Sequence, residues 1–167
     1  PAFTPLLIEY GLTQADVDLE AARAYNACAR RLGKRLRCHL KVDSGMGRLG
    51  FNGPARMDEL LEALQLEALE FEGIFSHFAA ADEPDRGYTE RQLEQFTSIY
   101  KELEASSGQK FRIKHCAASA GMLNYPQSHL DMVRPGIALY GHDPVQLPDG
   151  MALEPVMRLK CRVMQIK

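Results

Sequence analysis

Five segments of the chain carry the residue pattern of β-strands, and the clearest of them alternates between apolar and polar positions. This segment covers residues 36–42, and its period of two predicts a strand with one buried face. Its two faces are Leu36, Cys38, Leu40 and Val42 against Arg37, His39 and Lys41. The other predicted strands cover residues 12–17, 71–77, 111–116 and 130–141.

Between these strands, apolar residues recur every three or four positions, which predicts helices. Asp18 is a suitable N-cap for the first helix and Gly33 ends it, while Pro54 opens the second. A short fourth helix is predicted over residues 117–124. The apolar positions of the first three helices are Leu19, Ala22, Ala29 and Leu32, then Met57, Leu60, Leu61 and Leu64, then Leu93, Phe96, Tyr100 and Leu103.

Strands and helices therefore alternate, which is the pattern of right-handed βαβ units and a parallel sheet. Five strands form either a small doubly wound sheet or part of an eight-stranded (β/α) barrel, for which about 250 residues is typical. We expect this α/β domain to cover residues 1–145. Residues 146–167 are expected to be a linker and the first strand of a C-terminal β-domain, because "VMRLKCRVMQIK" alternates like an antiparallel strand.

Composition places the chain among globular proteins, with 46% hydrophobic and 25% charged residues. The net charge of −2 argues against a nucleic-acid partner, and no apolar run approaches the roughly 20 residues that span a bilayer. The start, "PAFTPLLIEY", lacks the features of a signal peptide. Four widely spaced cysteines argue against a metal site and favour reduced, buried thiols in a cytoplasmic protein.

Chemically versatile side chains follow successive predicted strands. Because the carboxyl ends of parallel strands share one face, we expect them to form a single site. They are Lys41 and Arg48, Ser76 and His77, His115 and Ser119, and Arg134 and Gly136.

Ser119 at a helix start, with the N–H groups of Gly136 and Ile137, predicts a phosphate site, although a plain helix cap is the alternative for Ser119. Arg48 stands among three glycines in "HLKVDSGMGRLGF" and is either a structural arginine or a ligand for an anion. His77 is either a residue of this site or an ordinary histidine at a strand end.

Four motifs, in order and in register, closely resemble the bacterial alanine racemases: "HLKVDSGMGRLGF", "GIFSHFAAADEPD", "HCAASAGMLNYP" and "DMVRPGIALYG". These are homodimeric enzymes with pyridoxal 5'-phosphate (PLP) in a barrel domain, and they interconvert L- and D-alanine for peptidoglycan synthesis. The resemblance favours the partial barrel over the doubly wound sheet. It covers nearly the whole chain.

The resemblance implies a role for each site residue. Arg134 would face the pyridine nitrogen of PLP, and His77 would lie against its ring. Ser119, Gly136 and Ile137 would hold the phosphate. Arg48 would contact the substrate carboxylate and the phenolic oxygen of the cofactor, and Lys41 matches a lysine that is carbamylated in many members.

The chain also departs from the family pattern. Members bind PLP through a lysine in a segment like "VKANAYGHG", which this sequence lacks, and their second base is a tyrosine of the C-terminal β-domain. Ala118 stands where "CANSA" is common. We therefore expect an internal fragment that is inactive alone and binds PLP weakly or not at all.

Three functions stay open at this point. The chain is part of an alanine racemase or of a related serine/alanine racemase, or a PLP-binding module without turnover, or a structural domain that retains the fold. For the racemase we expect a small-molecule amino-acid substrate as the partner.

Overall fold

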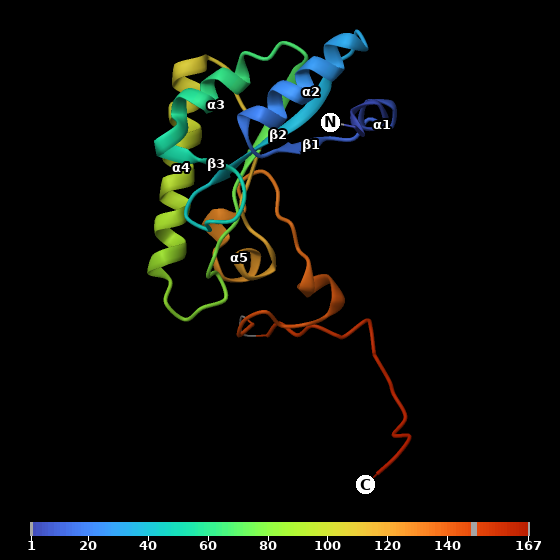
Figure 1. Cartoon of the computed structure of the whole chain (residues 1–167). Coiled ribbons are helices and arrows are strands. Elements are labelled where there is room, and N and C mark those ends of the chain that lie inside the picture. The colour runs from blue at the N-terminus through green and yellow to red at the C-terminus, as the bar shows by residue number, and fades with distance from the viewer. Residues whose placement is uncertain (1, 148–149, 167) are drawn as a thin grey trace.

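The computed structural model describes residues 2–147 and 150–166, and its centre is a parallel sheet (Figure 1). The strands β1 (Gln14–Asp16), β2 (Leu36–Asp43), β4 (Leu69–Phe75) and β5 (Ile113–His115) lie in the order β1-β2-β4-β5. A two-residue strand, β3 (Phe51–Asn52), pairs with the end of β2.

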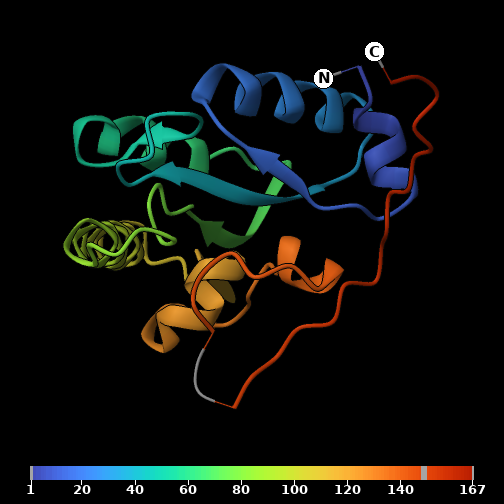
Figure 2. The same cartoon turned by 90° about the horizontal axis from the view of Figure 1, so that it is seen from below.

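Helices follow the strands in turn and form one layer. In Figure 2, α2 (Leu19–Arg31), α3 (Met57–Leu64) and α4 (Gly87–Ser107) follow one another around the outside of the sheet. Adjacent strands in chain order, joined by right-handed crossovers, keep successive helices on the same face. This arrangement is that of a barrel and excludes the doubly wound sheet, whose strand order reverses at a switch point.

The remaining helical elements lie outside this layer. They are α1 (Thr4–Glu9), α5 (Ser119–Asn124) and three 3₁₀ turns, η1 (Gly53–Arg56), η2 (Pro126–Ser128) and η3 (Ile137–Tyr140). The helix α1, which the sequence pattern did not predict, packs against α2. No helix among the described residues is long and apolar enough to cross a bilayer.

The alternation along β2 is confirmed. Its apolar residues are completely buried between the sheet and the helix layer: Leu36, Cys38, Leu40 and Val42. The other face turns away from the helices, yet Lys41 on it is only 6% exposed. This strand therefore contributes to the hydrophobic core on one face and to a polar interior on the other.

The predicted start and end of the first helix are confirmed. The N–H of Ala21 donates to the Asp18 carboxylate at the start of α2 (2.7 Å), and Gly33, with a φ of +62°, follows its C-cap residue. Two details were wrong. Leu32 lies beyond the last turn of α2 and is 42% exposed. Pro54 lies in η1 rather than at the start of α3, since a short 3₁₀ turn precedes that helix.

The predicted strand over residues 130–141 was wrong. Only one parallel bridge forms, between Arg134 and Ala118, and η3 follows it. Pro135 has no N–H to donate to a ladder. The next N–H groups, of Gly136 and Ala138, donate to the Ser119 hydroxyl instead of a strand.

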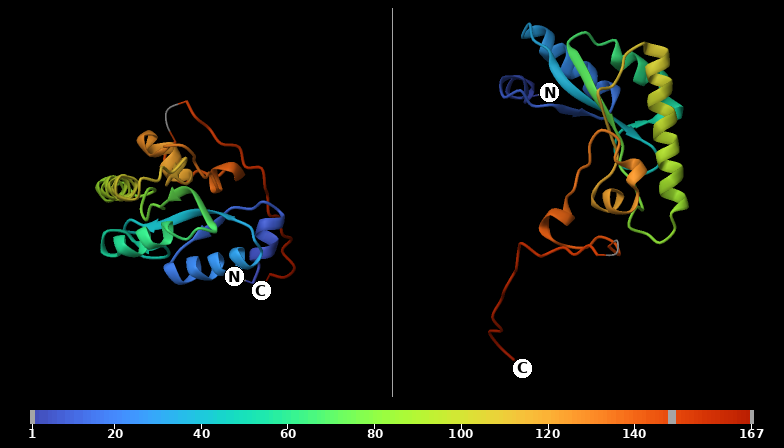
Figure 3. Two further views of the ribbon diagram at one scale, coloured as in Figure 1. Left: turned by 90° about the horizontal axis from the view of Figure 1, so that it is seen from above. Right: turned by 180° about the vertical axis from the view of Figure 1, so that it is seen from behind.

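The predicted strand at the C-terminus was also wrong for the described residues. Residues 151–166 have no regular secondary structure and extend away from the sheet (Figure 3). An alternating segment needs a neighbouring strand for its backbone hydrogen bonds, and no described segment pairs with it. Cys161 in this segment is exposed, which corrects the expectation of four buried thiols, although all four cysteines are free.

Asp16 at the end of β1 is completely buried, and neither carboxyl oxygen has a hydrogen-bond partner among the described residues. Burial and the neighbouring Asp18 raise the pKa of this carboxyl from 3.8 to about 7. As the pH rises, the unfolded chain releases this proton at a lower pH than the folded chain does. Stability therefore decreases as the pH rises from about 4 to about 7.

We predict that Asp16→Asn removes this loss of stability. At pH 8 the variant should exceed the wild-type protein by about 2–4 kcal/mol in free energy of unfolding, and at pH 4 the difference should nearly vanish. Urea unfolding at the two pH values measures both quantities. Asp58→Asn, at an exposed position of α3, is the matched control and should retain the wild-type pH slope. If the free energy of unfolding depends on pH in Asp16→Asn as it does in the wild-type protein, the pKa of Asp16 does not differ between the folded and the unfolded chain.

Candidate active site

The carboxyl ends of β4 and β5 meet around the guanidinium of Arg134. Its Nη2 donates to the carbonyl oxygens of Ser76 (2.9 Å) and Cys116 (3.3 Å), which follow β4 and β5. The same nitrogen lies 3.2 Å from Nδ1 of His77, and Nη1 lies 2.5 Å from Nδ1 of His115. Arg134 thus connects two strand ends through its side chain.

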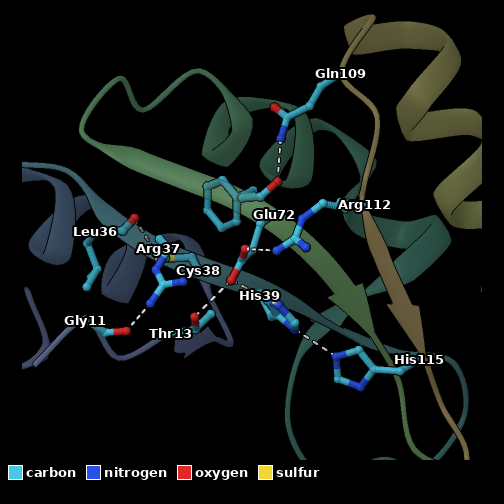
Figure 4. A network of polar contacts seen from close by, with 11 residues as sticks. Gly11, Thr13, Leu36, Arg37, Cys38, His39, Glu72, Gln109, Arg112 and His115 are labelled. Carbon is cyan, nitrogen blue, oxygen red and sulfur yellow. Dashed lines mark hydrogen bonds and ion pairs between the residues drawn. The ribbon is translucent and has the colours of Figure 1, made fainter. Parts of the chain in front are cut away.

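A chain of polar contacts leads from Arg134 to His115 and on across the sheet, and Figure 4 shows the part from His115 to Glu72. A guanidinium only donates, so Nδ1 of His115 accepts, and its Nε2 carries the proton and donates to Nδ1 of His39 (2.8 Å). The Nε2 of His39 then faces the Glu72 carboxylate at 3.7 Å. Glu72 also accepts from Thr13 (2.9 Å) and Arg112 (2.5 Å).

A glycine allows this packing of imidazoles. A Cβ on Gly73 of β4 would lie 2.7 Å from the His39 ring, so only glycine lets that ring lie flat against the strand. The pairing of β2 with β4 shifts register between Cys38 and His39, beside this contact. The local sequence thus leaves room for His39 on the polar face.

Burial keeps the imidazoles of this site uncharged. Burial, the positive charge of Arg134 and the neighbouring His39 together lower the pKa of His115 to about 3. Burial also lowers the pKa of His77, with additional effects from Arg134, Arg48 and Lys41. The lowered pKa of His77 thus reflects the positive charges of Arg134, Arg48 and Lys41, and the combined field of these charges favours an anionic ligand.

Lys41 is buried on the polar face of β2, next to these groups. Its pKa is lowered to about 8, chiefly by burial and also by the charges of Arg134 and Arg48, against the opposing effect of Asp43. Its ammonium donates to the carbonyl of Val42 (2.9 Å) and lies 5.6 Å from the centre of the Phe75 ring. An appreciable fraction of this amine is therefore neutral and nucleophilic at pH 8.

The loop that carries Arg48 depends on glycines with positive φ. They are Gly45 (+126°), Gly47 (+70°) and Gly50 (+115°), and a Cβ on Gly50 would lie 2.7 Å from the Lys41 carbonyl oxygen. Asp43 accepts from the N–H groups of Gly45 (2.9 Å) and Met46 (2.8 Å) and fixes the start of the loop. Arg48 is exposed and lines a groove of about 550 Å³ together with Asp43.

Ser119 begins α5, and Ala118 takes the N-cap position. The Ser119 hydroxyl oxygen accepts from the N–H groups of Gly136 (2.8 Å) and Ala138 (3.2 Å). Ile137, which the sequence suggested as a donor, lies between them with its side chain 51% exposed. A Cβ on Gly136 would meet nothing within 4 Å, so there is open space beside these donors.

Comparison with known proteins identifies the family. A model of the family "Alanine racemase, N-terminal domain" matches residues 1–144. The chain belongs to this family. The resemblance found in its four motifs is therefore confirmed.

Sequence relatives and solved structures agree with the assignment. The chain is 42% identical over 163 residues to an alanine racemase of Carboxydothermus hydrogenoformans and 43% identical over 164 residues to one of Chlorobaculum tepidum. These alignments cover 96% and 97% of this chain but only 44% and 42% of the relatives. The chain thus spans less than half the length of these relatives.

Among solved structures, the alanine racemase of Clostridium difficile 630 superposes with a TM-score of 0.85 at 36% identity, over 92% of this chain and 43% of that chain. The enzyme of Streptomyces coelicolor A3(2) gives a TM-score of 0.80 at 34% identity, over 85% and 38%. These similarities confirm that the parallel sheet is part of a (β/α) barrel.

Sequence reasoning missed several contributors to the site. His39 was placed on the polar face of its strand, but nothing in the sequence linked it to Glu72 or His115. Ala138 was missed because it contributes only a backbone N–H. Such contacts depend on tertiary packing, and the only local signal was the run of polar residues at the strand ends.

We predict that His115 stays neutral over the whole range from pH 8 to pH 5. NMR of its imidazole resonances should show no titration there, because the folded-state pKa is about 3. Arg134→Gln retains an N–H donor but removes the charge, and should raise the His115 pKa without restoring the ordinary value, since burial remains. A wild-type His115 that titrates near pH 6.5 would contradict the assigned hydrogen-bond chain.

Proposed function

We propose that this chain forms the PLP-binding part of an alanine racemase, an enzyme that interconverts L- and D-alanine. The observation that supports it best is the group of donors around Ser119, directly beside the buried charge of Arg134. A hydroxyl and two backbone N–H groups next to a guanidinium suit a phosphorylated ring with a basic nitrogen. The relatives are named alanine racemases, which selects alanine over serine as the proposed substrate.

The residues present fit PLP at the phosphate and at the ring. In the proposal the Ser119 hydroxyl and the N–H of Gly136, which bond to each other here (2.8 Å), would turn to phosphate oxygens in the open space beside Gly136. In the proposal Ile137 adds its N–H to this group. Arg134 would face the pyridine nitrogen, and His77 would lie against the ring, with its pKa lowered by burial and by Arg134.

The bound cofactor would withdraw electrons from the α-carbon of an amino acid, so that its proton can exchange. A guanidinium does not release its proton at neutral pH, so Arg134 would donate to the pyridine nitrogen and leave it unprotonated. Arg48 would bind the carboxylate of the amino acid, because its charge is close enough to act on Lys41 and His77, although the groove that it lines contains neither residue.

Lys41 is proposed to be carbamylated. Its neutral amine attacks the carbon of CO₂, a carbon–oxygen π pair moves to oxygen, and the nitrogen releases one proton, which leaves a carbamate anion. Burial favours this reaction because it lowers the pKa of Lys41 to about 8. The anion would then compensate the neighbouring charges of Arg48 and Arg134 and fix the position of Arg48.

Among the described lysines, Lys41 is the one that lies at this site, and its ammonium is engaged with Val42. Lys114 contacts Glu104 and the Tyr100 ring, on the helix side of the sheet. The covalent link expected from the family therefore has no counterpart among the described residues. We propose that PLP binds this chain noncovalently and weakly, and that the chain alone does not racemise alanine.

The whole enzyme is proposed to be a cytoplasmic homodimer acting on a small amino acid. The four free thiols suit a reducing compartment. The exposed apolar side chains of Leu139 and Tyr140 in η3 leave an area of this domain available to further protein.

We predict that Ser119→Ala weakens binding of PLP to this chain by about tenfold, because one hydrogen bond to a charged phosphate is lost. Pyridoxal, which lacks the phosphate, should bind more weakly than PLP and with the same affinity to both proteins. Fluorescence titration gives the four dissociation constants. An equal effect of Ser119→Ala on both ligands would place the phosphate elsewhere.

The racemase proposal is tested by a chimera in which this chain replaces the matching segment of the Clostridium difficile alanine racemase. We expect the chimera to racemise L-alanine. In the same background, Arg48→Lys should lower kcat/KM by about tenfold or more, since a planar two-point contact with carboxylate is lost. A folded chimera that binds PLP but does not racemise alanine would overturn the proposal.

A further inference from the structure

We propose that Gln92, together with Tyr88, is a positioning residue that fixes the Arg48 loop relative to the His77 segment. The two side chains are called here the α4 bridge. They lie one turn apart near the start of α4 and contact both segments. The inference deepens the proposed function and rests on it, because the bridge would set how tightly the site holds an anionic ligand.

The side-chain amide of Gln92 makes two hydrogen bonds with the segment that follows β4. Its oxygen accepts from the N–H of Ala79 (2.9 Å), and its nitrogen donates to the carbonyl of His77 (3.4 Å). Gln92 is only 2% exposed, so the hydrogen bonds of this amide are made inside the protein. An unsatisfied buried amide is costly, so this side chain and the His77 segment hold each other in place.

The same bridge contacts the Arg48 loop. The Tyr88 hydroxyl donates to the carbonyl of Gly45 (2.6 Å). A Cβ on Gly45 would lie 3.2 Å from that hydroxyl and 3.4 Å from Cγ of Gln92, so the loop packs closely on both side chains. Gly45 also has a φ of +126°, a backbone conformation that residues with a Cβ rarely adopt.

A second connection joins the two segments on the sheet side. Ser44 follows β2, Ser76 follows β4, and their hydroxyl oxygens lie 2.7 Å apart with both residues 1% exposed. One contact alone would let the segments rotate about it. The α4 bridge supplies the contact on the helix side, and the two together define one relative position for Arg48 and His77.

A purely structural role predicts a different outcome from a positioning role. If Gln92 only filled the core, its loss would lower overall stability and loosen the fold everywhere. A positioning role confines the effect to residues 43–50 and 77–80 and transfers it to ligand affinity. Thr89 in the same turn offers a matched control, because it is completely buried and its hydroxyl has no partner among the described residues.

Amide hydrogen exchange and PLP titration on this chain test the inference with four variants. Gln92→Leu should speed exchange in both segments by about tenfold, as expected for the loss of one buried hydrogen-bond set. Tyr88→Phe should do so only in residues 43–50, and Gln92→Glu, which retains the acceptor for Ala79, only beside His77. Thr89→Val should change neither. The PLP dissociation constant should increase about fivefold or more in Gln92→Leu and stay unchanged in Thr89→Val.

The possible outcomes distinguish a positioning role of Gln92 from a structural one. Exchange that rises uniformly, or equally in Thr89→Val, would overturn the positioning role, and so would an unchanged PLP affinity in a Gln92→Leu protein with loosened segments. If the wild-type chain binds no PLP, the proposed function fails while the exchange pattern still tests the bridge. If Gln92→Leu does not fold, Gln92→Glu and Tyr88→Phe provide the same regional comparison.

Discussion

The half-buried guanidinium of Arg134 is the interaction on which the arrangement of the site depends. Partial burial of a charge is costly unless acceptors surround it, and here the carbonyl groups of Ser76 and Cys116 and the ring of His115 supply them. These acceptors come from the ends of β4 and β5. The side chain of Arg134 therefore joins strand ends that a further strand would otherwise join through its backbone.

This use of the side chain explains the path of the backbone after it. The N–H groups of Asp131 and Arg134 donate to the carbonyls of Lys114 (3.1 Å) and Ala117 (2.9 Å), and Pro135 then interrupts the ladder. The chain is thereby free to turn at Gly136 and to direct its N–H groups to Ser119. The position that ends the sheet is thus the position that directs these N–H groups to the proposed phosphate site.

Sequence patterns predicted those features that depend on local geometry. The faces of β2 and the N-cap at Asp18 follow from periods and capping preferences that act within a few residues. The strand over 130–141 failed because its apolar alternation is outweighed by Pro135 and by a hydroxyl on a different element, Ser119. The network from Arg134 to Glu72 is equally outside the reach of a sequence pattern, since it joins residues of three strands whose register is set by tertiary packing.

The same distinction applies to Arg48. A loop with three glycines of positive φ cannot hold one shape through its own backbone preferences, so its order must come from outside. Asp43 and Tyr88 provide that order, yet both act at Gly45, near the start of the loop. Beyond Gly47 the chain is exposed, and Arg48 has no hydrogen-bond or ion-pair partner among the described residues. The loop is therefore anchored at its base while its cation stays available, which is the combination that a residue needs to close on a carboxylate without being neutralised beforehand.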